Sequence, residues 1–220
     1  MTLSAVGIAL FSVIAYLSGD PARSRIPIDP EIATHYLSVV AHALPASLAL
    51  LIGPFQFATP LRNSFPRVHR ILGRVYMVSI VFATIAAVFA TAFTLDGVPV
   101  QVGFTLLIAA WTYTLVQGYR TIRRGQVQLH RIWMIRNYSL TFAAVLLRAF
   151  LGLGLALQRS FPGLTFAEIY SSSVWASVLI CVIVPEYFIL QRSPAPRAAP
   201  RGRRENTRST NAAAIPVRSR

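Results

Sequence analysis

The chain of 220 residues has a single cysteine, no lysine and few charged residues. Because Cys181 stands alone, an internal disulfide and a metal cluster built on cysteines are both excluded. Charged residues make up 13% of the chain and hydrophobic residues 55%, a balance that is unusual for a soluble domain. All 21 basic residues are arginines, and since a GC-rich genome would produce the same choice, the absence of lysine indicates no function.

Acidic residues are also scarce, with 7 against 21 arginines and a net charge of +14. Such a charge suits nucleic acid, but these arginines flank long apolar segments, which is the pattern of a membrane protein. No carboxylate is near His42, His69 or His130 in the sequence, which disfavours a zinc hydrolase. We find no Ser-His-Asp arrangement, phosphate loop or nucleic-acid motif. The sequence therefore indicates a protein of the lipid bilayer, with no nucleic-acid partner and no firmly predicted metal site.

Six apolar segments are long enough to cross a hydrocarbon core of ~30 Å as helices, which takes about 20 residues each. They run approximately over residues 3–17, 35–57, 71–95, 102–119, 132–157 and 171–190. The first segment is short, but no positive residue precedes it and no small-residue cleavage site follows it. We therefore expect an uncleaved helix there and not a signal peptide. The predicted fold is all-α, a membrane bundle of about six transmembrane helices.

Arginines are concentrated in every second connection between these segments and in the C-terminal tail. By the positive-inside rule, those connections and both termini are expected to be cytoplasmic, in a bacterial inner membrane. We expect the arginines nearest this interface to contact anionic lipid headgroups. Residues 1–191 would form one integral membrane domain. Residues 192–220, rich in Arg, Pro and Ser without apolar periodicity, would be a disordered cytoplasmic tail.

Polar residues of the expected helices fall on single faces, and polar groups inside a membrane are costly enough that their direction is informative. For example, His130, Asn137 and Arg148 lie within about 20° of one line at 100° per residue. We expect such faces to meet inside the bundle, and we expect Glu186 to find an arginine partner there, either Arg74 or Arg136. The candidates for a polar interior are Gln56, Arg74, Tyr76, Arg136, Asn137, Arg148 and Glu186.

Two of the four histidines, His69 and His130, are expected at similar depth at the entrances of two parallel helices. Two interpretations stay open. They could be the ligands of a bis-imidazole haem b with arginines near its propionates, or hydrated first-turn residues at the interface. His42 is a third cofactor-binding candidate. It lies ~10.5 Å from His35 along one helix face, which is too far for the two to hold one ion together.

Three stretches resemble an uncharacterised bacterial family of multi-pass membrane proteins catalogued as domain of unknown function 2306. They are RRGQVQLHRIWMIRNYSLTFAAVLLR at residues 123–148, HALPASLALLIGPFQF at 42–57 and PRVHRILGRVY at 66–76. The resemblance spans roughly residues 35–187. It implies a multi-pass membrane protein with no established activity, and the family assigns no role to the matching residues.

Three functions stay open from the sequence. The first is haem-linked or other membrane redox chemistry through inward-facing histidines. The second is transport or binding of a small molecule in the polar interior of the bundle. The third is a non-enzymatic structural or partner-binding role.

Overall fold

The computed structural model describes residues 2–17, 19–20 and 32–192, and every regular element in them is a helix. Five of these helices are long and apolar enough to cross a membrane. The predicted all-α membrane bundle is thereby confirmed. The helices are α1 (Thr2–Leu17), α2 (Ala33–Gln56), α3 (Thr59–Ser64), α4 (Pro66–Ala92), α5 (Val98–Arg123), α6 (Val127–Gln158) and α7 (Phe166–Arg192).

Two short helices account for the differences from the expected six spans. Helix α1 has 16 residues and is about 24 Å long at ~1.5 Å per residue, less than a hydrocarbon core of ~30 Å. The described residues therefore contain five helices of spanning length. Helix α3 has six residues and was not expected from the sequence. Residues 193–220, where we expect a disordered tail, lie outside the described residues.

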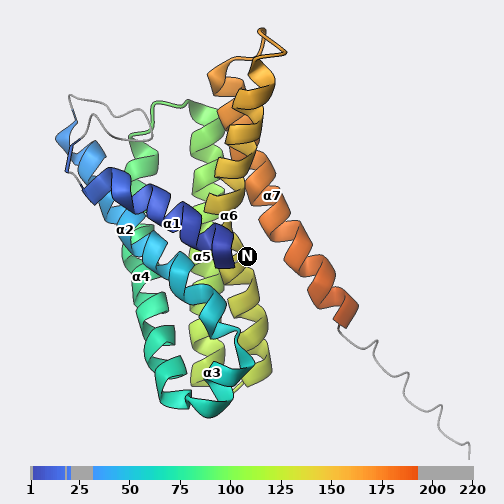
Figure 1. Cartoon of the computed structure of the whole chain (residues 1–220). Coiled ribbons are helices and arrows are strands. Elements are labelled where there is room, and N and C mark those ends of the chain that lie inside the picture. Colours follow the sequence, from blue (N-terminus) through green and yellow to red (C-terminus); the bar gives the residue numbers. More distant parts are fainter. Residues whose placement is uncertain (1, 18, 21–31, 193–220) are drawn as a thin grey trace, which may run out of the picture.

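The long helices run alternately up and down the bundle (Figure 1). Helix α2 packs against α4, and α6 packs against both α5 and α7. Helix α1 lies across α2, and α3 lies at the end of the bundle where α4 and α6 begin (Figure 1). Prolines lie in the first turn of three of these helices, where the missing N–H costs nothing: Pro60 in α3, Pro66 in α4 and Pro99 in α5. In Figure 1 the C-terminal half of α7 diverges from α6.

The bundle is apolar on the outside and small-residue-rich on the inside. Large apolar side chains such as Phe82 and Ile183 are 62% and 61% exposed, as expected of surfaces that face lipid tails. Alanines at the helix contacts, including Ala49, Ala83 and Ala143, are fully buried or nearly so. Small residues let helix backbones approach closely in a membrane, where apolar surface alone does not drive association.

Candidate functional site

Three consecutive polar residues of α6 connect it to three other helices. Asn137 donates from Nδ2 to Trp111 O on α5 at 2.9 Å. Tyr138 donates to Leu50 O on α2 at 3.2 Å, and Ser139 donates to Cys181 O on α7 at 2.8 Å. Successive residues of a helix point about 100° apart, so three in a row necessarily face different neighbours. We call residues 137–139 the α6 hub.

Two hub side chains donate hydrogen bonds to backbone carbonyls that prolines leave without an intrahelical donor. A proline inside a helix has no N–H, so the carbonyl four residues earlier loses its donor. Pro54 in α2 leaves Leu50 O without one, and Pro185 in α7 does the same to Cys181 O. These are the two carbonyls that Tyr138 and Ser139 bind. The hub therefore stabilises two helices that proline would otherwise weaken.

The tyrosine fits because residue 53 of α2 has no side chain. A Cβ at Gly53 would lie 2.0 Å from Tyr138 Cε2, well inside van der Waals contact. The Tyr138 ring therefore packs directly on the backbone of α2, beside the carbonyl that its hydroxyl binds.

Asn137 is the centre of a buried hydrogen-bonded network. It is 0% exposed, accepts from Tyr76 Oη at 2.8 Å and donates to Thr114 Oγ1 at 2.9 Å as well as to Trp111 O. Thr141 Oγ1 accepts from Trp111 Nε1 at 2.9 Å and lies 3.2 Å from Tyr76 Oη. Asn137 thus uses both amide hydrogens and its oxygen. Such a fully paired network fixes the helices relative to one another, and it leaves no open polar group for a ligand.

His42 lies at a different level of the bundle from His69 and His130. His42 Nδ1 is 2.9 Å from Ala83 O, and His130 Nδ1 is 2.8 Å from Gly118 O. A carbonyl only accepts, so each Nδ1 carries the proton, and in the neutral ring Nε2 keeps a lone pair. Ala83 is fourteen residues beyond His69 on α4, which places His42 about 21 Å from the level of His69.

His69 and His130 are both in the first turn of their helices, at the end of the bundle where α4 and α6 begin. His69 Nδ1 is buried and has no hydrogen-bond partner among the described residues, and the same holds for Gln56 Nε2. Gln56 Oε1 is 3.2 Å from where a Cβ of Gly73 would be, one turn along α4 from His69. No group of three or more potential metal ligands occurs in the described part of the chain.

Glu186 is paired with Arg136, one of the two partners expected from the sequence. Arg136 Nε donates to Glu186 Oε1, and Nη2 donates to Oε2 at 2.8 Å. The Trp133 ring covers the guanidinium at 4.5 Å from its centroid, and the Tyr113 ring is edge-on to Trp133 at 5.6 Å. An aromatic face and a carboxylate thus hold one arginine between α5, α6 and α7.

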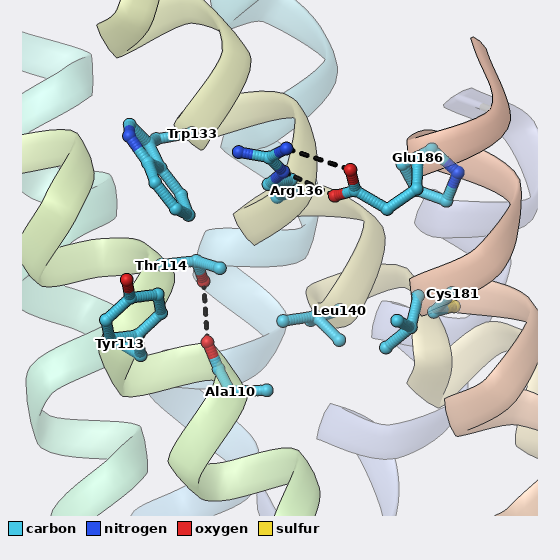
Figure 2. Close-up of a pocket in the computed structure, with 10 residues that line it drawn as sticks. Ala110, Tyr113, Thr114, Trp133, Arg136, Leu140, Cys181 and Glu186 are labelled. Carbon is cyan, nitrogen blue, oxygen red and sulfur yellow. Dashed lines mark hydrogen bonds and ion pairs between the residues drawn. The ribbon is translucent and has the colours of Figure 1, made fainter. Parts of the chain in front are cut away.

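This ion pair forms part of the wall of a cavity of about 260 Å³ between α5, α6 and α7, which we call the lateral cavity (Figure 2). The rest of the wall is mainly apolar, with Leu140 and Val182 among its residues. Pro185 also lines it. Sequence reasoning missed the cavity. A proline next to an intramembrane carboxylate, Pro185–Glu186, was the signal that could have indicated it.

The two remaining arginine candidates lie apart from both sites. Arg74 is exposed on α4, on the face opposite Tyr76, and lies in a groove with Arg67 and Arg70. Arg148 is half-buried, and its Nη1 donates to Ala144 O of its own helix at 2.9 Å. Neither joins the Arg136–Glu186 pair or the network around Asn137.

A family model described as "Predicted membrane protein (DUF2306)" matches residues 39–189, which include most of α2, all of α3 to α6 and most of α7. A search of curated proteins and a search of solved structures found no match. The matched region contains the α6 hub, the lateral cavity and three of the four histidines.

Proposed function

The chain belongs to the DUF2306 family of predicted membrane proteins, and we propose that it binds a small amphipathic molecule in the lateral cavity. The observation that carries this proposal is an apolar cavity of about 260 Å³ with a charged pair in its wall. Ligand sites are typically apolar concavities with a few polar groups that fix orientation. The volume lies slightly below the usual range of about 300–1,000 Å³, so it suits a ring-sized head group and not a whole lipid.

The proposed ligand enters from the bilayer. The cavity lies where the C-terminal half of α7 diverges from α6, and the apolar residues there are exposed, Val182 at 44% and Ile183 at 61%. A hydrophobic tail would remain among the lipid chains beside these residues. Only the head would need to pass between α6 and α7.

The head group is expected to be neutral and to carry a hydrogen-bond acceptor. Because Arg136 and Glu186 neutralise each other, the pair has no net charge that would attract an anion or a cation. Arg136 has five N–H donors and uses two of them on Glu186, so others are available to a carbonyl or hydroxyl oxygen. Trp133 and Tyr113 offer flat surfaces to a planar head.

Tryptophan fluorescence tests this proposal with decylubiquinone as the probe, because it combines a neutral dicarbonyl ring with an apolar tail and quenches indole emission. The full chain is placed in phosphatidylcholine nanodiscs and titrated. We expect saturable quenching that is largely lost in Trp133→Phe. The matched control is Trp175→Phe, whose indole donates to Pro99 O away from the cavity, and this variant should retain the saturable component.

Replacing both charges tests the polar half of the site without leaving one of them unpaired. The double variant Arg136→Leu/Glu186→Leu should fold and should bind decylubiquinone about tenfold more weakly, as expected for the loss of a hydrogen bond to a charged group. Linear quenching that is equal in the wild type and Trp133→Phe would mean simple partitioning into the bilayer, and the proposal would be wrong.

A second candidate function is haem-linked redox chemistry at His69 and His130. The observation that favours it is the bond from His130 Nδ1 to Gly118 O, because metal-binding histidines commonly donate their other ring N–H to a carbonyl. His69 lies at the same end of the bundle, with an Nδ1 that has no partner among the described residues. No histidine lines the lateral cavity, so the two candidate functions use different parts of the bundle.

An absorption spectrum of protein purified from haem-supplemented cells, oxidised and then reduced with dithionite, tests the haem candidate. A Soret band should be present, should be lost in His69→Ala and in His130→Ala, and should persist in His42→Ala, about 21 Å away. A folded, colourless wild-type protein would rule it out.

We also propose a bacterial inner membrane with the arginine-rich end of the bundle in the cytoplasm. Helix α3 and the beginning of α4, and the end of α5 and the beginning of α6, carry arginines and lie at one end of the bundle (Figure 1). Positive residues of short loops are retained on the cytoplasmic side.

A further inference from the structure

A second concave surface lies on the outside of the bundle. Unlike the mainly apolar lateral cavity, it is lined mostly by charged residues. It is a groove of about 210 Å³ lined by Arg67, Arg70, Ile71 and Arg74 of α4. All four side chains are exposed. We call it the arginine groove.

Helix geometry places the three arginines away from the bundle. At 100° per residue, Arg67, Arg70 and Arg74 fall within an arc of about 60°. The buried residues of α4, such as Tyr76 and Ala83, lie on the opposite side of the helix. The groove therefore faces the surroundings of the bundle and not its interior.

No carboxylate in the described part of the chain neutralises this cluster. Among the described residues none of the three arginines takes part in an ion pair, and the hydrogen bond of Arg70 is from Nε to Pro66 O at 3.3 Å. Three positive charges thus share one short stretch of helix surface. Guanidinium groups in such an arrangement bind phosphate oxygens well, since their planar fork matches them.

The same face of α4 becomes apolar immediately beyond the groove. Val78, Val81, Ile85 and Val88 continue the line of the arginines, and they are 53%, 47%, 54% and 51% exposed. This strip extends along a helix long enough to cross a membrane. A charged groove at the start of the strip and apolar ridges after it match the two halves of a phospholipid.

We propose that the arginine groove binds one anionic phospholipid. Its phosphate lies against Arg67, Arg70 and Arg74, and an acyl chain follows Val78, Val81 and Ile85. A free phosphate would use only the arginines and would not account for the apolar strip in line with them. This site is independent of the ligand proposed for the lateral cavity, because it shares no residue with it.

Native mass spectrometry of the full chain, released from detergent with added lipid, tests this site. Phosphatidylglycerol and phosphatidylcholine of equal chain length are compared. We expect one retained phosphatidylglycerol, preferred about tenfold or more over phosphatidylcholine. The triple variant Arg67→Gln/Arg70→Gln/Arg74→Gln should lose this preference. Because the three side chains are exposed, the variant should elute as a folded, monodisperse protein.

The matched control removes three exposed arginines at the same end of the bundle, in Arg120→Gln/Arg123→Gln/Arg124→Gln at the end of α5. It should keep the bound phosphatidylglycerol within about twofold of the wild type. Equal loss in both triple variants would show a general charge effect and would overturn the site. Displacement of the lipid by millimolar inorganic phosphate would identify a free-phosphate site and would overturn the lipid assignment. If the groove variant fails to fold, the single variant Arg70→Gln replaces it, with Arg123→Gln as its control.

Discussion

Tyr138 makes two contacts with α2. Its ring packs on Gly53, and its hydroxyl donates to Leu50 O, the carbonyl left without a donor by Pro54. Removal of the hydroxyl oxygen alone separates the two contributions. Removing the hydroxyl in Tyr138→Phe keeps the ring and leaves Leu50 O without its donor. We expect a loss of about 1–2 kcal/mol in the free energy of unfolding. Titration of helicity with SDS in mixed micelles measures it. Tyr113→Phe is the control, because the Tyr113 ring is 56% exposed. An unchanged midpoint in Tyr138→Phe would show that Leu50 O needs no such donor.

Gly53 tests the packing half of the same contact. A methyl group there would overlap the Tyr138 ring at 2.0 Å, and both are held by long helices, so α2 and α6 would have to separate. We expect Gly53→Ala to lower the free energy of unfolding by about 1–3 kcal/mol, as overpacking of a core does. Gly152→Ala on α6 is the matched control, because a Cβ at Gly152 has nothing within 4 Å. It should be neutral or slightly stabilising, since alanine favours helix.

Ser139 of α6 donates to the carbonyl that Pro185 leaves free in α7, and a double-mutant cycle isolates this contact. Ser139→Ala alone leaves Cys181 O without a donor and should cost about 1 kcal/mol in the free energy of unfolding. In a Pro185→Ala background the new amide at residue 185 bonds Cys181 O, so the same serine substitution should cost almost nothing. The predicted coupling is thus about 1 kcal/mol, from four SDS titrations. Additive effects would contradict this account of Ser139.

The long helices were predictable from the sequence, whereas the short ones and the cavity were not. Apolar runs of 20 residues mark α2 and α4 to α7 because a hydrocarbon core fixes the length of a span. Helix α3 has only six residues and no such constraint. An arginine partner for Glu186, either Arg74 or Arg136, was predicted because an intramembrane carboxylate requires one, and the structure shows that it is Arg136. The lateral cavity depends on how α7 packs against α5 and α6, which no local sequence pattern determines. Arg74 was expected in the polar interior because it lies at nearly the same depth as Tyr76. Two residues that are two positions apart on a helix point about 160° apart, so Tyr76 is buried and Arg74 is exposed.

The direction of the whole bundle in the membrane follows from where its arginines lie. Helices α4 and α6 begin, and α5 and α7 end, toward the end of the bundle that carries α3 and the α5–α6 turn (Figure 1). By the positive-inside rule we propose that this end faces the cytoplasm. The turn between α4 and α5, with Asp96 and Gly97 and no arginine, lies at the other end.

Two reporter fusions decide this orientation. A green fluorescent protein attached after Arg220 should fluoresce, and alkaline phosphatase at the same position should be inactive, because each folds on one side of the membrane only. Alkaline phosphatase inserted at Gly97, between α4 and α5, should be active. The inverse pattern would reverse the orientation and would move the arginine groove away from the cytoplasmic leaflet. Activity at both positions would mean an even number of crossings between them, against the three made by α5, α6 and α7.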